Sequence, residues 1–185
     1  MFPRITEYVH QLIQPRIQQG DLVIDATMGN GHDTVFLAKI VGDTGQVFAY
    51  DIQQQAIENT ELRLLEEGLH HRVTLRLCSH DQMEHEENSV SVVVFNLGYL
   101  PGSDQSLTTE PHTTLGALDL ARKLIKVGGL IVITVYWGHE QGKEEKLKVE
   151  EYVEQLPYPE YMVLKYQYIN PKNQPPFVLA IEKRK

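Results

Sequence analysis

The chain is poor in cysteine: Cys78 is the one cysteine among 185 residues, so no disulfide can form within it. Such a chain suits the reducing cytosol, and we expect a cytoplasmic protein. No stretch approaches the roughly 18 consecutive apolar residues that a membrane-spanning helix needs. The N-terminal segment contains Glu7 and lacks a small-residue cleavage site, which argues against a secretory signal. The sequence therefore predicts no membrane partner.

Basic residues are also scarce, with 17 Lys and Arg against 25 Asp and Glu and a net charge of −8. Contacts to phosphates need lysine and arginine, so this balance weakens a nucleic-acid role without excluding it. Many of the bases gather in the C-terminal half, where they form either solvated faces or a local RNA contact: Lys143, Lys146, Lys148, Lys165, Lys172 and residues 183–185. The eight histidines are scattered, and none has the paired ligand spacing of a structural zinc site. We predict no metal.

The most informative stretch is LVIDATMGNGHD, residues 22–33. An apolar run ends in Asp25, a glycine turn follows at 29–31, and a helix-compatible segment comes next. A strand, a glycine turn and a helix in this order place backbone N–H groups and a helix N-terminus beside a bound ligand. The next apolar run ends in Asp51, whose carboxylate is suited to accept both hydroxyls of a ribose. These features predict a nucleoside-cofactor site, against the alternative of an ordinary turn.

Two details favour S-adenosylmethionine (SAM) over a dinucleotide. The dinucleotide fingerprint requires a third glycine at the position that Thr34 occupies. Asp25 lies four residues before Gly29, which matches the SAM pattern D-x-x-x-G-x-G. The predicted cofactor-binding residues are Asp25, Thr27, Met28, Gly29, Asn30, Gly31, His32, Asp33, Asp51, Ile52, Gln53, Ser79, His80 and Asn96.

Predicted strands and helices alternate along the chain, which indicates an α/β fold with a mostly parallel sheet. We expect one domain over residues 1–185, with an N-terminal helix in 1–20 and a Rossmann-like core in 21–185. Its seven-stranded sheet should carry helices on both faces and end in an antiparallel hairpin. The expected strands are 22–26, 46–50, 73–78, 89–96, 130–137, 161–170 and 177–184, and the expected helices are 5–17, 35–41, 54–67, 115–125 and 144–155. The glycine pair 128–129 should turn the chain into the fifth strand, and the long segment 98–112 reads as a functional loop.

Ligands in such sheets lie beyond the carboxyl ends of the strands, which selects Asn96 at the end of the fourth strand. Asn96-x-Gly98-Tyr99 resembles the N/D-P-P-Y signature of amino methyltransferases, with Leu97-Gly98 in place of two prolines. Methyl transfer needs a neutral, well-positioned amine, which the Asn96 side-chain oxygen or nearby backbone carbonyls would orient. Asn96 is otherwise a turn residue, and Tyr99 is either a base-stacking or a packing aromatic.

Further candidates follow the third and fifth strands. His80 either contacts the adenine edge or caps a helix. Tyr136, Trp137 and His139 follow the fifth strand as predicted substrate-binding residues, and His139 is also a candidate acid–base group because histidine titrates near neutrality. Asn96, Tyr99 and His139 are therefore the predicted catalytic residues, although His139 also suits a surface loop. Cys78 ends an apolar strand and fits the core better than a nucleophile.

The whole chain resembles a bacterial family long labelled as rRNA methylases, whose characterised members are MnmM-type (YtqB-like) tRNA methyltransferases. The segments that carry the resemblance are DATMGNGHDT (25–34), AYDIQ (49–53), SHD (79–81), FNLGYLPG (95–102) and YWGHEQGKEE (136–145). The resemblance implies SAM-dependent methylation of the aminomethyl nitrogen on the wobble uridine of certain tRNAs, with the anticodon loop as partner. It also implies a homodimer.

Other classes of function stay open on the residues alone. The acidic charge and modest size favour a small-molecule N-methyltransferase, and the family label suggests rRNA. A non-catalytic SAM- or RNA-binding protein would be expected to lose the N-x-G-Y turn, which this chain keeps.

Overall fold

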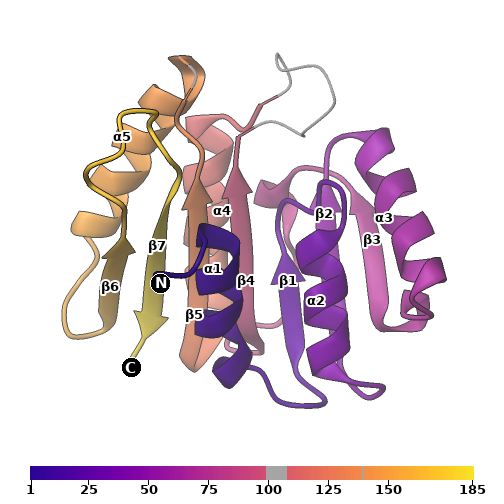
Figure 1. The fold of residues 1–185 in the computed structure, drawn as a ribbon. Coiled ribbons are helices and arrows are strands. Elements are labelled where there is room, and N and C mark those ends of the chain that lie inside the picture. Colours follow the sequence, from indigo (N-terminus) through magenta and orange to yellow (C-terminus); the bar gives the residue numbers. More distant parts are fainter. Residues whose placement is uncertain (99–107, 139) are drawn as a thin grey trace.

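The computed structural model describes residues 1–98, 108–138 and 140–185, so the predicted site residues Tyr99 and His139 lie outside the described part. Within that part, seven strands form one sheet in the order β3-β2-β1-β4-β5-β7-β6 (Figure 1). All neighbouring strands from β3 to β5 are parallel, and β7 pairs antiparallel with both β5 and β6. The strands are β1 Leu22–Asp25, β2 Gln46–Asp51, β3 Val73–Leu77, β4 Val90–Leu97, β5 Ile125–Val135, β6 Tyr161–Tyr166 and β7 Phe177–Lys183. The predicted α/β fold with an antiparallel C-terminal end is confirmed.

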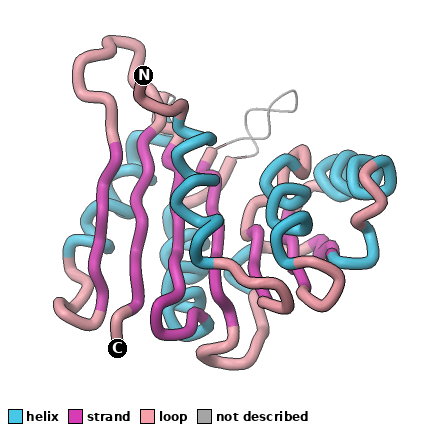
Figure 2. The backbone as a smooth tube through the Cα atoms, turned by 60° about the horizontal axis from the view of Figure 1, so that its bottom comes forward, coloured by secondary structure: helices cyan, strands magenta, loops and turns pink. Residues whose placement is uncertain are grey.

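Helices cover both faces of the sheet (Figure 2). They are α1 Ile5–Ile13, α2 His32–Val41, α3 Gln54–Glu66, α4 Pro111–Leu124 and α5 Glu140–Glu154, with single 3₁₀ turns at Gln14–Arg16, His70–Arg72 and His80–Gln82. One core packs α1 and α2 against the sheet, and a second core packs α4 and α5 against the opposite face. Successive β4 residues alternate between these two cores, with Val92 and Val94 in the first and Val93 and Phe95 in the second. A strand buried on both faces is apolar along most of its length, as β4 is over residues 92–95.

Several predicted boundaries differ from the structure, for example β6, which ends at Tyr166 and not at 170. The first helix ends at Ile13 and not near Gly20, since Pro15 cannot donate a backbone hydrogen bond and the chain continues as a 3₁₀ turn. Conversely, α4 begins four residues before the predicted start at 115, with Pro111 in the first turn, where a missing N–H costs nothing. α5 begins at Glu140, ahead of the expected 144.

The glycine pair does not turn the chain into β5, because β5 already begins at Ile125. Gly128 has a φ of +81° and lies where the pairing of β4 with β5 shifts register. A Cβ on Gly129 would lie 2.7 Å from the Lys126 carbonyl oxygen and 3.0 Å from that of Ser91. The two glycines therefore form a bulge within a longer strand. At Gly128 the positive φ favours glycine, and at Gly129 the neighbouring backbone leaves no space for a side chain.

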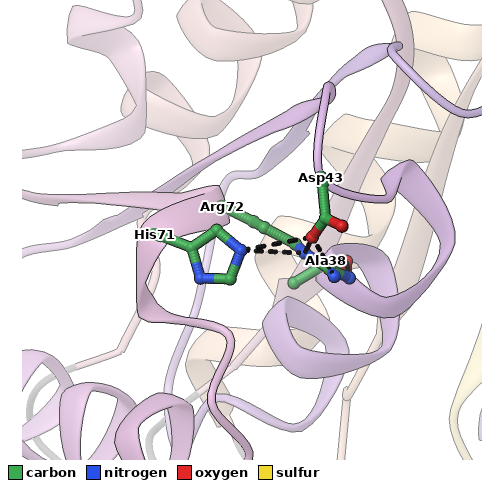
Figure 3. A network of polar contacts seen from close by, with 4 residues as sticks. All are labelled: Ala38, Asp43, His71 and Arg72. Atoms are coloured by element: carbon green, nitrogen blue, oxygen red, sulfur yellow. Dashed lines mark hydrogen bonds and ion pairs between the residues drawn. The ribbon is translucent and has the colours of Figure 1, made fainter.

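Polar contacts connect the end of α2 with the 3₁₀ turn before β3, near the edge of the sheet that β3 forms. The Arg72 guanidinium contacts the Asp43 carboxylate and donates to the Ala38 carbonyl oxygen at 3.1 Å, and His71 Nε2 lies 3.3 Å from the same carboxylate (Figure 3). These contacts connect the C-terminal end of α2 to the turn before β3.

Aromatic side chains hold the N-terminal helix on the C-terminal strands. The Tyr8 ring stacks on Tyr166 with 3.8 Å between centroids, and the Tyr168 hydroxyl donates to the Pro3 carbonyl oxygen. α1 thus packs along β5 and β7, two strands that lie far from it in sequence (Figures 1 and 2). This packing brings one face of α1 to the carboxyl ends of the central strands.

Candidate active site

The glycine turn between β1 and α2 adopts backbone angles that favour glycine. Gly29 and Gly31 have φ values of +51° and +79°. A Cβ on Gly31 would lie 2.8 Å from Thr60 Oγ1 and 3.0 Å from Thr60 Cα, so α3 packs directly on this turn. The third-glycine position of a dinucleotide site holds Thr34, which is fully buried and donates its hydroxyl to Asp25 at 2.6 Å.

Asp25 lies beneath the turn and does not line the cavity above it. Its carboxylate accepts the Thr34 hydroxyl and the Thr27 backbone N–H. Burial, and after it the nearby charge of Asp33, raise the pKa of Asp25 to about 7, although the two hydrogen bonds oppose the rise. Predicted as a cofactor contact, Asp25 is placed by the structure as a support for the turn.

Asp51, at the end of β2, faces the glycine turn. One carboxylate oxygen accepts the Gly29 N–H at 3.0 Å and the other accepts the Gln53 N–H at 3.0 Å. Burial raises the pKa of Asp51, and these backbone donors counteract the rise. A carboxylate oxygen can accept more than one hydrogen bond, so Asp51 keeps capacity for two ribose hydroxyls.

A cavity of about 1130 Å³ opens along the carboxyl ends of the strands. It exceeds the roughly 300–1,000 Å³ of ordinary small-molecule sites, which leaves space for a second reactant beside a cofactor. The predicted residues that line it are Thr27, Met28, Gly29, Asn30, His32, Asp33, Asp51, Ile52, Gln53, Ser79, His80, Asn96, Tyr136 and Trp137. Cys78 also lines it and packs partly against the core.

His80 is buried on the cavity wall, edge-on to Phe95 at 5.8 Å. Burial lowers the pKa of His80, so its ring is neutral at pH 7. Its Nε2 atom has no hydrogen-bond partner among the described residues. A buried, unpartnered ring nitrogen is suited to a polar group of a bound ligand.

Asn96 lies where the cavity passes from the glycine turn toward α1. Its backbone N–H donates to Thr27 Oγ1 at 2.7 Å, which joins the ends of β4 and β1. Its side-chain Nδ2 donates to Asp33 Oδ2 at 2.8 Å. Gly98, two residues on, has a φ of +151°, and a Cβ there would lie 3.2 Å from Tyr136 Cβ. Glycine is thus required where the amino methyltransferase signature has proline.

Hydrogen bonds from two threonines and a buried carboxylate connect Gly98 at the end of β4 with α4 and α5. Gly98 and Thr109 exchange hydrogen bonds of 3.0 Å, and the Thr109 hydroxyl donates to Glu145 at 2.6 Å. Glu145, almost fully buried on α5, also accepts the Thr114 hydroxyl at 2.7 Å. No motif in the sequence indicates these hydrogen bonds, because Glu145 is one of many charged residues in a helix that is polar over most of its length.

The remainder of the cavity wall comes from parts of the chain that the motifs did not indicate. Thr6 and His10 contribute from α1, and Gln174 and Pro176 contribute from the connection between β6 and β7. The Trp137 indole N–H donates to the Pro175 carbonyl oxygen at 2.9 Å and so holds this connection. The one available sequence signal was that Thr6 and His10 share a helix face one turn apart.

Three of the lysines considered for phosphate contacts have carboxylate partners within 3 Å. Lys143 Nζ lies 2.7 Å from Glu140, while Lys146 and Lys165 lie 2.9 Å and 2.6 Å from Glu150. Because these cations are already paired, the lysines fit solvent-exposed helix and strand faces better than a surface prepared to bind phosphates. No group of three potential metal ligands occurs among the described residues, and none of their helices is long and apolar enough to cross a membrane.

The residues present fit SAM: a glycine turn beside a helix N-terminus, a carboxylate at the end of β2, and an unpartnered histidine nitrogen on the wall. The described fold superposes on a protein from Streptococcus mutans, described as a "putative methyltransferase" in complex with SAH, with a TM-score of 0.90. That pair is 36% identical and the match covers 99% of each chain. Fold and site together define a class I SAM-dependent methyltransferase.

The chain belongs to the family described as "Putative rRNA methylase", whose pattern matches residues 47–182. A crystal structure of a "putative rRNA-methylase" from Clostridium thermocellum matches with a TM-score of 0.95, at 40% identity and 99% coverage of both chains. The chloroplastic protein named tRNA (mnm(5)s(2)U34)-methyltransferase of Arabidopsis thaliana is 40% identical over 192 aligned positions. That alignment covers 97% of this chain and 70% of the relative.

Proposed function

We propose that this protein methylates the aminomethyl nitrogen of the modified wobble uridine of tRNA, converting 5-aminomethyl-2-thiouridine to 5-methylaminomethyl-2-thiouridine. The observation that carries the proposal is the 40% identity, over 97% of this chain, to a relative named for methylation at U34 of tRNA. SAM supplies an activated methyl group on a sulfonium. The protein's part is to bind both reactants in line and to keep the amine lone pair free.

The shape of the cavity supports a flipped-out nucleoside as the second reactant. The cavity extends past Asn96 to Tyr136, which is 39% exposed, and to Trp137. RNA bases in loops are read by splaying them out and stacking them on aromatic rings. Tyr136 and Trp137 are the described aromatics suited to this role, and the substrate roles of Tyr99 and His139 stay predictions.

For the cofactor, we assign Asp51 to the ribose, Met28 and Asn30 to the wall beside it, and His80 to the adenine edge. We assign the Asn96 side chain to the substrate amine, and we do not expect it to contribute much to the affinity for SAM. Asn96→Ala should therefore lower kcat by roughly 10–1000-fold, the range for loss of a positioned polar group at a reacting centre, with little change in SAM affinity. Single-turnover methylation at the normal rate in this variant would show that the amide is structural.

The ion pairs of Lys143, Lys146 and Lys165 set an expectation for RNA binding. Because these three cations already have carboxylate partners, we expect few phosphate contacts and an affinity for tRNA that depends only weakly on salt. The counterion-release slope should correspond to fewer than about five phosphates. Binding measured between low and moderate salt gives this slope directly.

The decisive assay uses tRNA from cells that lack this activity, so that its wobble nucleoside carries a free aminomethyl group. The purified protein and SAM should convert that nucleoside to the methylaminomethyl form, as detected by mass spectrometry of digested tRNA. The matched control is tRNA from cells that have the activity, which should accept no methyl group. Ribosomal RNA in a third arm tests the substrate that the family description suggests.

A small-molecule N-methyltransferase is the second candidate, which the net charge of −8 and the paired lysines favour. The same assay separates the two functions when a free primary amine is added as a fourth arm. Efficient methylation of the amine with none on the tRNA would overturn the RNA proposal.

We also propose that the chain acts as a single catalytic domain in a homodimer, the dimer being what the family resemblance implies. The single cysteine favours the cytosol as its location. Light scattering behind a sizing column should then give about twice the chain mass of 21.2 kDa. A mass of one chain at micromolar concentration would contradict the dimer.

A further inference from the structure

Hydrogen bonds link three side chains from three separate elements at the cavity wall. His10 on α1 has Nε2 2.8 Å from Asp33 Oδ1, and Asp33 on α2 accepts Asn96 Nδ2 from β4 at 2.8 Å on its other oxygen. All three side chains line the cavity. The first and last members lie 86 positions apart, as the difference of their residue numbers shows.

The carboxylate in the middle fixes the orientation of both neighbours. An ionised carboxylate only accepts hydrogen bonds, so Asn96 must present its NH₂ group to Asp33 and direct Oδ1 away from it. For the same reason His10 must carry its proton on Nε2. The Asn96 oxygen is thereby left as the amide atom directed away from Asp33.

The charge state of Asp33 depends on these two donors. Burial would raise the pKa of Asp33, but the hydrogen bonds from His10 and Asn96, together with the electrostatic effect of His10, help to hold that pKa below its usual value. His32, next to Asp33 on α2, acts in the same direction. Asp25 from β1 faces Asp33 with a repelling charge, and Tyr136 from the end of β5 has its pKa raised by burial and by Asp33.

We propose that His10 is a positioning residue for methyl transfer: through Asp33, it holds the Asn96 amide with its oxygen toward the substrate nitrogen. This inference rests on the proposed function, since an amine is the nucleophile that such an oxygen orients. The amine lone pair forms the new N–C bond, while the C–S bond breaks with its electron pair on sulfur. The positive charge passes to nitrogen, which then loses a proton to water. The Asn96 oxygen and the Asp33 charge stabilise the nitrogen as this charge develops.

A purely structural role for His10 is the competing explanation, because its ring also stacks on Phe36 with centroids 3.6 Å apart and 5° between the planes. Two substitutions separate the roles. His10→Phe keeps a ring that can stack on Phe36 and removes the N–H donor. His10→Gln removes the ring and keeps an N–H that can reach Asp33.

We expect His10→Phe to lower kcat by about 10–100-fold, the order for a lost positioned donor, with the SAM dissociation constant within about threefold of wild type. Without the donor, burial raises the pKa of Asp33, so the acidic limb of the kcat profile should move to higher pH. His10→Gln should restore kcat to within about tenfold of wild type and return the limb toward its original position. Asp33→Asn should lower kcat by roughly 100–1000-fold, because an amide at position 33 lets Asn96 turn its NH₂ toward the substrate.

The assay is multiple-turnover methylation of tRNA that carries the free aminomethyl group, with SAM affinity by calorimetry and folding by thermal unfolding for each variant. Wild-type kcat and an unmoved pH profile in folded His10→Phe would overturn the inference. So would a pattern in which His10→Gln is impaired and His10→Phe is not, because that pattern reports stacking. If the wild type methylates a free primary amine but not the tRNA, the proposed substrate fails, and the same variant series on that amine still decides the role of His10.

Discussion

Replacing Gly31 with alanine tests the physical basis of the cofactor turn. Gly31 has a φ of +79° and is the N-cap residue of α2. An added Cβ would lie 2.8 Å from Thr60 Oγ1 and 3.0 Å from Thr60 Cα. The hydroxyl has limited freedom to move, since it donates to the Gly29 carbonyl oxygen at 3.1 Å. The substitution therefore adds both backbone strain and overlap with α3.

The two costs can be estimated separately. A left-handed backbone at a non-glycine residue costs roughly 1–2 kcal/mol. Forcing a methyl group into a packed contact costs roughly 1–3 kcal/mol more. Gly68→Ala is the matched control, because Gly68 has a φ of +69° and a Cβ added there would meet no described atom within 4 Å. Gly68→Ala should show the strain alone, about 1–2 kcal/mol.

Urea unfolding of both variants measures the difference, which we expect to be about 1–3 kcal/mol in the free energy of unfolding. For a chain of this size, each kcal/mol lowers Tm by roughly 2–4 °C. Calorimetry should also show weaker SAM binding for Gly31→Ala and unchanged binding for Gly68→Ala. Equal destabilisation of the two variants would refute the reasoning, since it would mean that α3 moves away from the turn at no cost.

Two further substitutions test carboxylates of the site. Because the folded pKa of Asp25 is about 7 and the unfolded value is lower, its contribution to stability is full below the unfolded pKa and is lost as the pH rises through 7. Asp25→Asn should therefore gain stability relative to wild type by about 2–3 kcal/mol between pH 5 and pH 8, and a difference in urea stability that does not vary with pH would contradict the burial argument. Asp51→Ala should weaken SAM binding at least about tenfold, since hydrogen bonds to a charged group contribute roughly 1.5–3 kcal/mol each. Unchanged affinity by calorimetry in the folded variant would show that the ribose lies elsewhere.

Local patterns in the sequence determined most of the sheet and the cofactor turn. β4 is apolar at successive positions because both of its faces are buried, and no other part of the chain is needed to see this. The turn after β1 is also local, since the two glycines and the acid before them fall within seven residues. Element boundaries were less predictable, because the bulge at Gly128 and Gly129 depends on how closely β4 approaches.

The hydrogen bonds that link His10, Asp33 and Asn96 form only in the tertiary structure. Asn96 was predicted as an amine-orienting residue, but the orientation of its side-chain amide depends on Asp33, 63 positions away. His10 was absent from the predicted site because a histidine on an amphipathic helix carries no motif. It reaches the cavity only because aromatic contacts such as Tyr8 on Tyr166 hold α1 against the C-terminal strands.

The role of the lysines in the C-terminal half was ambiguous in the sequence because their partners are also fixed by tertiary structure. The sequence showed lysines in the C-terminal half, and only the folded chain shows that Glu150 lies within an ion-pair distance of both Lys146 and Lys165. Backbone conformation and hydrophobic periodicity depend on residues that are near neighbours in sequence, so they can be predicted from the sequence. Hydrogen-bond partners and ion pairs form between groups that meet only after the helices pack on the sheet, and so they were fixed by the tertiary structure.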